Sequence, residues 1–518
     1  MESKRTLKTI LALIITASVI SATVLLKKKE STVKGPFSLT PPKKDWPVFG
    51  GHLQRNFVNP HVKNLPAEWD EETNVKYSIT LGSLAYGGPI VADGRIFVGT
   101  NNNNPRDPKI KGDKGIIMCF RESDGKFLWQ AVHDKLPAGR VNDWPNEGIC
   151  SSPAIDGDKL YYVSNRCEIV CADVKGDGKG GAKIYWTLDM IGKLKVFPHN
   201  LATSSPLIVG DTLFVVTSNG VDEKHLRIPH PDAPSFLAVN KNTGKVLWQS
   251  NAPGLAIMHG QWSSPVYAEP NGKGQIIFPG GDGWIYSFNP SDGKLLWKFD
   301  CNPKDAVYRL GGTGTRNDFI ATPVVHDNKL YIGVGQDPEH DTGIGHFWCI
   351  DITKTPKNKE KDLSPKDKDF DPKAEVNKDS GLVWHFGGVV KKGEKNWTGR
   401  NYHFGRSMST CSITDDILYV ADLTGFVFYM DAQTGKVHWV HDMNAATWSS
   451  TYWADGKVYI GNEDGLMLVF KHGKKKELLA EVDMGVDKVR VAPAAANDTL
   501  YVMTENPTKL WAISKKKK

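Results

Sequence analysis

The chain has 518 residues, of which 24% are charged, and it carries a formal net charge of +7. The excess charge is terminal, because residues 1–34 hold seven Lys and Arg against two Glu, and Lys515–Lys518 add four Lys. The nearly neutral body argues against a nucleic-acid groove, and the basic ends favour proximity to a membrane or a solvated tail.

Residues 9–26 form an apolar run of about membrane-spanning length that follows three basic residues. The run predicts a secretory signal or a signal anchor. No Ala-x-Ala cleavage site stands out and Lys27–Lys29 follow at once, which favours an uncleaved anchor. No cysteine precedes Cys119, so a lipid anchor of the lipobox type is excluded. We therefore expect residues 1–34 to tether a body that lies outside the cytoplasm.

Residues 35–71 are rich in proline and carry the sequence DWPVFGGHLQRN at 45–56. We interpret them as an N-terminal arm that lies on the folded body. The next segment, NVKYSITLG at 74–82, has no partner strands upstream. It aligns with the Trp-containing strands described below, with Tyr77 at the Trp position, and is predicted to be an isolated outer strand.

The rest of the chain repeats. The sequence TGKVLW at 243–248 returns three times in close copies and twice in weaker ones, with a period of roughly 40 to 60 residues. Glycine takes the positive-φ position of a tight turn, and the strand that follows buries a Trp. One Trp at the same place in each unit can pack that unit against its neighbour. These residues are Trp129, Trp186, Trp248, Trp297, Trp384 and Trp439.

Each unit is predicted to contain four strands, of which the first is rich in small residues and the second is rich in β-branched residues. Seven full units are predicted, at 83–134, 148–190, 200–252, 259–301, 318–388, 404–443 and 446–484. Residues 489–513 supply only three strands of an eighth, and the strand at 74–82 is what it lacks. We predict an all-β fold, an eight-bladed β-propeller over residues 72–514 closed by an N-terminal strand, with 515–518 as a basic tail.

The (T/D)-G-K-x-x-W turns, the Ser-Ser-Pro first strands and the WPVFGG opening resemble the propeller repeat of pyrroloquinoline quinone (PQQ) enzymes. The wider PQQ-like superfamily includes the non-enzymatic propeller subunit of the bacterial outer-membrane β-barrel assembly machinery. The resemblance covers almost all of residues 45–514. It implies a bacterial propeller, which the apolar run at 9–26 would anchor in the inner membrane on the periplasmic side. The resemblance leaves open whether the protein is a scaffold or an enzyme.

Blade connections and the loops between second and third strands emerge on one face of a propeller, so their polar side chains converge around the axis. Long loops at 101–115, 219–234 and 335–346 lie on this face and favour a binding surface. Basic and aromatic residues there could hold an anionic planar ligand, or could only cap blade ends and bind water. The candidates are Arg140, Glu147, Asn200, His259, Gln261, Trp262, Arg316, Asp318, His403, Arg406, Trp448 and Arg490.

The resemblance also implies what a quinone site would need. Glu147, Asn200 and Asp318 would contribute to calcium binding and base catalysis, and Arg316 or Arg406 would hold the quinone. The adjacent cysteine pair common in these enzymes is missing. No separate metal site is predicted, since the spacing of His340, Asp341 and His346 matches no established motif.

Seven cysteines form no disulfide ladder. Cys119, Cys171 and Cys349 share one repeat position and are expected in the core, whereas Cys150, Cys167, Cys301 and Cys411 could include a bridge that sequence cannot pair.

No hydrolase or kinase motif occurs in a suitable context. The sequence therefore favours a membrane-tethered scaffold that binds a protein or small ligand. A PQQ- and calcium-dependent dehydrogenase of alcohols or sugars is the alternative.

Overall fold

The computed structural model describes residues 44–84, 86–365 and 377–515. The predicted anchor at 9–26 and its basic flanks lie outside the described residues, as does most of the basic tail. Across the described ranges, no helix combines the length and the apolar character needed to cross a bilayer.

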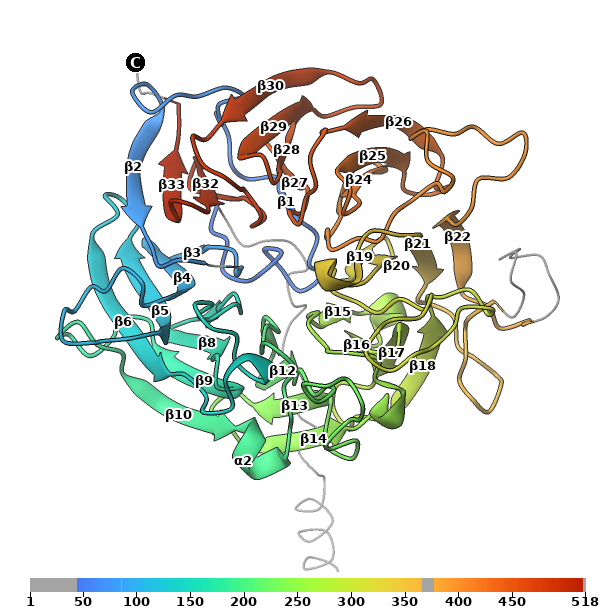
Figure 1. Ribbon diagram of the computed structural model, residues 1–518, viewed down its shortest axis with the longest axis horizontal. Coiled ribbons are helices and arrows are strands. Elements are labelled where there is room, and N and C mark those ends of the chain that lie inside the picture. The colour runs from blue at the N-terminus through green and yellow to red at the C-terminus, as the bar shows by residue number, and fades with distance from the viewer. Residues whose placement is uncertain (1–43, 85, 366–376, 516–518) are drawn as a thin grey trace, which may run out of the picture. The chain divides into compact units, whose positions relative to one another are not determined.

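The described residues form eight sheets, each with four antiparallel strands of the propeller, arranged around a central axis (Figure 1). Blades one to four contain β3 (Ile90–Ala92), β4 (Arg95–Asn101), β5 (Lys114–Arg121), β6 (Phe127–Asp134); β7 (Ala154–Asp156), β8 (Lys159–Val163), β9 (Glu168–Asp173), β10 (Ile184–Asp189); β11 (Leu207–Val209), β12 (Thr212–Val216), β13 (Phe236–Asn240), β14 (Val246–Ser250); and β15 (Val266–Ala268), β16 (Gln275–Pro279), β17 (Trp284–Phe288), β18 (Leu295–Asp300). The first strand of each blade lies nearest the axis.

Blades five to eight follow the same order. They contain β19 (Val324–His326), β20 (Lys329–Val334), β21 (His346–Asp351), β22 (Leu382–Gly387); β23 (Ser412–Thr414), β24 (Ile417–Ala421), β25 (Phe426–Asp431), β26 (Val437–Asp442); β27 (Tyr452–Ala454), β28 (Lys457–Gly461), β29 (Leu466–Lys471), β30 (Leu478–Asp483); and β31 (Ala494–Ala496), β32 (Thr499–Thr504), β33 (Lys509–Ile513) with β2 (Val75–Thr80). One short helix, α2 (Met190–Leu194), and four single 3₁₀ turns lie in connections between these strands. The predicted all-β eight-bladed propeller is confirmed.

Strand β2 is the outermost strand of the eighth blade. It pairs antiparallel with β33, so that Tyr77 lies opposite Ala512. The Tyr77 hydroxyl donates a 2.5 Å hydrogen bond to the carbonyl oxygen of Glu122 in the first blade, and its ring lies against Gly125 there. Tyr77 thus makes the contact to the next blade that a Trp makes elsewhere.

Four of the six repeated Trp side chains reach the following blade in one way. Their indole N–H groups donate to backbone carbonyl oxygens at 2.9 to 3.0 Å: Trp129 to Val174, Trp186 to Lys241, Trp248 to Pro290 and Trp384 to Ala432. Trp297 instead donates to Gln275 in its own blade, and the Gln275 amide then donates to Ile352 of the next blade. The indole N–H of Trp439 has no acceptor among the described residues.

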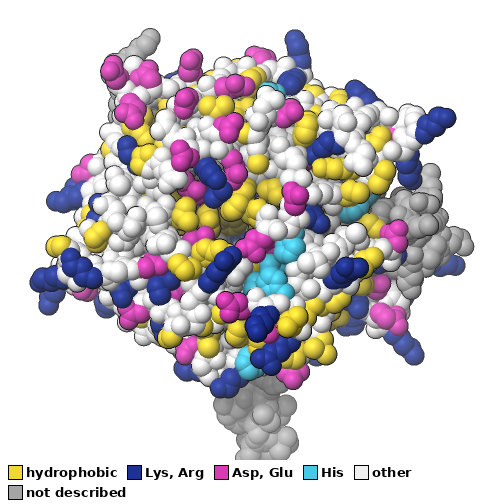
Figure 2. Space-filling view, viewed as in Figure 1, with side chains coloured by type: hydrophobic (Ala, Val, Ile, Leu, Met, Phe, Trp, Pro, Cys, Tyr) yellow, Lys and Arg dark blue, Asp and Glu magenta, His cyan; other side chains and the backbone are white. Residues whose placement is uncertain are grey.

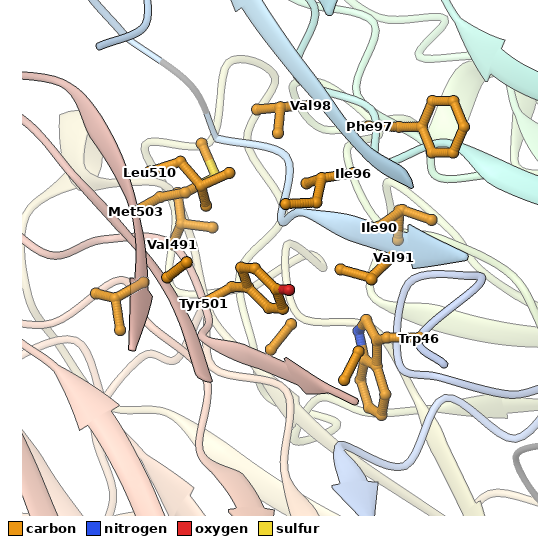
Figure 3. Close-up of a cluster of buried hydrophobic side chains, with 14 of the residues drawn as sticks. Trp46, Ile90, Val91, Ile96, Phe97, Val98, Val491, Tyr501, Met503 and Leu510 are labelled. Carbon is orange, nitrogen blue, oxygen red and sulfur yellow. The ribbon is translucent and has the colours of Figure 1, made fainter. Parts of the chain in front are cut away.

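The N-terminal arm lies across the axis at the end opposite the blade connections. Its backbone carbonyl oxygens accept N–H groups from the innermost strands: Pro47 from Ile155, Leu53 from Tyr267, Gln54 from Val325 and Phe57 from Trp453. Trp46 pairs with Val91, and the short strand β1 (Val58–Asn59) runs parallel to β27. Figure 3 shows Trp46 beside Val91, with Tyr501 of the eighth blade in the same buried cluster. The arm is therefore a part of the core of the ring.

Three side chains of the arm complete this contact with the blades. Arg55 is fully buried and donates to the carbonyl oxygens of Phe49, Ser205, Pro206 and Pro265. Asn56 exchanges hydrogen bonds with the backbone of Ile413, and the Asn59 amide donates to Ala495.

All seven cysteines are buried and unbridged, so none of the four left open in the sequence is paired.

Candidate functional site

A cavity of about 330 Å³ lies on the axis and opens on the face that carries the blade connections. Figure 2 shows the hollow near the centre of this face, with histidine side chains beside it. Phe49 of the arm lines the cavity, and four large aromatic side chains form much of its wall: Tyr86, Trp144, Trp262 and Trp448. The cavity is therefore mostly apolar, with few charged groups.

A ring of hydroxyl side chains lines the middle of the cavity. Each belongs to the small-residue segment before the first strand of a blade: Ser152, Ser205, Ser264, Thr322, Thr410 and Ser450. Between several neighbouring blades, the backbone N–H of one member donates to the hydroxyl of the next, as from Ser152 to Ser205 at 3.1 Å and from Thr410 to Ser450 at 2.9 Å. The repeated small-residue segment, Ser-Ser-Pro in several blades, thus joins neighbouring blades, a role that was not predicted from the sequence.

Five of the predicted site residues line this cavity: Glu147, Asn200, Trp262, Trp448 and Arg490. Glu147 accepts a 3.0 Å hydrogen bond from the Tyr86 hydroxyl, and its second carboxyl oxygen is buried with no partner among the residues that the structure describes. Burial raises the pKa of Glu147 to about 7, although the Tyr86 hydrogen bond opposes the shift. Glu147 is therefore a carboxyl group that titrates near neutrality in a largely apolar wall.

The arginines at the rim are already paired with acidic groups. Arg490 bonds Glu463 at 2.7 Å and Glu505 at 3.3 Å, and its guanidinium stacks over Trp448. Arg140 stacks over Trp144, with its guanidinium 3.7 Å from the Glu339 carboxylate. These pairs hold the two Trp rings in place and leave little unpaired positive charge for an anionic ligand.

The other predicted site residues support loops and do not line the cavity. Gln261 bonds the backbone of Asn219 and Gly281. Arg316 bonds the Asp300 carboxylate at 2.6 Å, and His403 bonds Glu394 at 2.8 Å. Arg406 donates to the Asn317 side chain and to the His340 and Asp341 carbonyls. Asp318 is buried, and burial raises its pKa well above the usual value. Except for Asp318, whose Oδ1 has no hydrogen-bond partner among the described residues, these residues use their polar groups within the protein.

A cluster of four histidines lies beside the cavity wall and brings four loops together. His259 contacts His199, His225 and His340, with ring centroids 4.4 to 4.8 Å apart. Asp337, which lines the cavity, bonds both His259 and His340. Although its burial opposes the shift, these hydrogen bonds lower the pKa of Asp337. The sequence singled out His340 but grouped it with Asp341 and His346, because it could not show which loops meet.

The calcium and quinone set implied by the resemblance does not assemble in the cavity. Glu147 and Asn200 line it, but Asp318 does not, and neither Arg316 nor Arg406 does. Calcium requires six to eight oxygen ligands. The cavity wall has two other carboxylates, and both are already paired. Asp337 bonds His259 and His340, and Glu339 faces Arg140. The residues present therefore do not fit a quinone held against a calcium ion.

Eight four-stranded blades with Trp docking and an axial cavity define a PQQ-like β-propeller. The family model described as "Outer membrane protein assembly factor BamB" matches residues 113–365 and 374–517. The chain belongs to this family. No curated protein gives a significant match to the sequence.

Solved structures with the same fold include members of both functional groups. BamB from Moraxella catarrhalis is 12% identical, with a TM-score of 0.51 over 85% of this chain and 98% of that chain. A quinohemoprotein alcohol dehydrogenase from Comamonas testosteroni is 13% identical, with a TM-score of 0.61 over 92% and 81%. A europium-containing methanol dehydrogenase is 12% identical, with a TM-score of 0.62 over 92% and 99%. At these identities the likeness shows the fold alone.

Proposed function

We propose that the protein is a scaffold that binds another protein on the blade-connection face and performs no chemistry of its own. The observation that carries this proposal is an apolar patch, defined as Leu226, Leu255, Val307 and Tyr308. These side chains are 73%, 76%, 49% and 41% exposed, and they lie on loops of the third and fourth blades and their connections. Large exposed apolar groups that gather on one face are typical of protein-binding sites.

The loops of the apolar patch are joined by hydrogen bonds. The Tyr308 hydroxyl donates to the carbonyl oxygen of Ile257 at 2.9 Å, and the Gly311 N–H donates to Met258 at 2.7 Å. These bonds connect the loop of Leu255 to the loop of Val307. A surface that is ordered before binding loses less conformational entropy when a partner docks, which favours affinity.

The alternative is a PQQ-dependent dehydrogenase, which the fold shared with quinoprotein enzymes supports. It is the weaker proposal because the residues that would bind calcium and the quinone do not meet in the cavity. The family description, outer membrane protein assembly factor, instead supports a role with other proteins. We further propose that residues 9–26 tether the propeller to the inner membrane on its periplasmic side, and that β2 closes the ring.

Site-specific photo-crosslinking in cells tests the scaffold proposal. A photoreactive residue at Leu255 is expected to give a protein adduct of defined mass, and Leu255→Asp with Leu226→Asp should abolish partner binding. Leu247 provides the matched control, since it is 49% exposed but lies on the outer strand β14. Equal adducts at 247 and 255 would contradict the proposed face. Dye reduction with alcohols or sugars after addition of PQQ and calcium would instead establish the enzyme.

A further inference from the structure

Three imidazole rings meet where three loops of the propeller converge. His199 lies in the connection to the third blade, His225 in the loop between β12 and β13, and His259 in the connection to the fourth blade. Each can offer one ring nitrogen such that the three atoms lie within 4.8 Å of one another. Two of the residues are buried and His225 is half-buried, so the group has a route from solvent.

Hydrogen bonds fix which ring nitrogen is free in two of these histidines. His199 Nδ1 lies 2.9 Å from the carbonyl oxygen of Val221, which can only accept, so Nδ1 carries the proton. His259 Nδ1 lies 3.0 Å from the Asp337 carboxylate and carries its proton for the same reason. The lone pairs of these rings are therefore on Nε2. An oriented imidazole whose other nitrogen donates to a carbonyl or carboxylate is the usual arrangement of a metal ligand.

The two free nitrogens differ in what they contact. His199 Nε2 is buried and has no hydrogen-bond partner in the described part of the chain, which costs free energy in a dry site. His259 Nε2 lies 3.3 Å from His225 Nε2. With Zn–N bonds of about 2.0 to 2.1 Å, two nitrogens on a tetrahedral zinc ion are about 3.3 to 3.4 Å apart. The observed separation fits two ligands on one ion, and it is also the distance of a hydrogen bond between the two rings.

We propose that His199, His225 and His259 bind a divalent transition-metal ion through their Nε2 atoms, with zinc as the ion that fits. Asp337 lies outside this set and orients His259 through its Nδ1 proton. His340 supports Asp337 from the other side, since its Nδ1 lies 3.0 Å from the same carboxylate oxygen and its Nε2 faces the Gly311 carbonyl at 2.6 Å. Three imidazoles are a ligand set that suits zinc, copper or nickel and disfavours calcium.

Bound metal would connect the three loops. His225 directly precedes Leu226, and His259 follows the short turn that carries Leu255, so the ion would hold two members of the apolar patch in place. Metal binding itself does not depend on the proposed function. It can be measured without any protein partner.

The test uses the full-length protein, stripped with a chelator, equilibrated with zinc chloride and gel-filtered before elemental analysis. The wild type is expected to retain one zinc per chain, and His225→Ala to weaken binding by at least about tenfold. Asp337→Asn should weaken it by about 10- to 100-fold, the range for residues that orient a ligand. His61→Ala is the control, because His61 is exposed on the arm and far from the cluster in sequence.

Cobalt(II) binding by the wild type gives a readout that does not depend on how the variants fold. Tetrahedral nitrogen ligation is expected to produce intense visible ligand-field bands, which zinc then displaces. Retention of zinc by His225→Ala at the wild-type level, or a wild-type protein that retains none, would overturn the proposal. So would a cobalt spectrum without tetrahedral bands.

Discussion

Trp248 of the third blade lies over Gly293 in the turn of the fourth, so close that a Cβ on this glycine would come within 2.6 Å of the indole. Trp129 meets Gly176, Trp186 meets Gly244 and Trp384 meets Gly435 in the same way. The Trp of one repeat therefore packs against the Gly of the next blade and not against the Gly of its own repeat. The glycine serves two purposes, a positive φ for the turn and space for the neighbouring indole.

Substitution of Gly293 by Ala should separate these two purposes. The new Cβ meets the Trp248 ring, and the backbone holds a φ of +68° that disfavours any side chain. Strain and overlap together should lower the free energy of unfolding by about 2 to 4 kcal/mol, measured by chemical denaturation. Gly157→Ala is the control, because it has φ +61° with no atom within 4 Å, and should cost only about 1 kcal/mol. Equal losses in both variants would show that the indole contact contributes nothing.

The repeat made the fold predictable from sequence. Recurrent Asp/Thr-Gly-Lys turns and Trp strands specify blade number, strand order and even the place of Tyr77, because each signal is local and occurs many times. The insertion after β21 was harder to predict. Within it, Leu363 is buried and its N–H donates to the carbonyl oxygen of Lys298 in β18, so this residue packs on the fourth blade. A single such contact leaves no periodic signal.

The site was predicted less completely for the same reason. Residue type and loop position identified Glu147, Trp262 and Arg490 as cavity residues, but Arg316 and Arg406 have the same signature and are bound within the loops. Their partners follow no fixed spacing, since Asp300 lies 16 residues before Arg316 whereas Asn317 lies 89 residues before Arg406. The histidine cluster depends on loops from three blades, and only the three-dimensional structure shows that His199 and His225 meet His259.

Removal of residues 72–82 should open the eighth blade. Without β2, the edge of β33 from Lys509 to Ile513 loses its partner strand, and Trp511 becomes more exposed. An unpaired strand edge can form hydrogen bonds with another chain, which favours aggregation. We expect a lower melting temperature and oligomers in light scattering. The control is Tyr77→Phe, which keeps the strand and removes only the hydrogen bond to Glu122, at a cost of about 1 kcal/mol. A deletion variant that stays monodisperse with unchanged melting would refute closure by β2.

Arg55 should be essential for holding the N-terminal arm against the blades. Its guanidinium is fully buried against four backbone carbonyl oxygens, and burial lowers its pKa to about 9. Arg55→Met would leave those oxygens without donors, which should cost about 3 to 5 kcal/mol and expose the arm to limited proteolysis. Arg140→Met is the comparison, because Arg140 is largely exposed at the cavity rim and should cost less than about 1 kcal/mol. Protease resistance equal to wild type in Arg55→Met would contradict this role.

Glu147 should make the protein less stable as the pH rises through the range below neutrality. The unfolded chain releases this proton near the ordinary pKa of 4.5, whereas burial keeps it bound in the folded protein until about pH 7. Below pH 4.5 both states hold the proton, and between the two values only the folded state does. The free energy of unfolding therefore falls across this window by about 3 kcal/mol and stays lowered above it.

Glu147→Gln has no proton to lose at this position and should lack that part of the pH dependence. The variant should match wild type near pH 4.5 and be more stable at pH 8, because the wild type must then carry a charge in an apolar wall. Urea denaturation at both pH values, with Glu339→Gln as an exposed rim control, measures the difference. If wild type and Glu147→Gln show parallel pH profiles, the carboxyl is solvated in the folded protein and the cavity wall is more polar than its lining residues indicate.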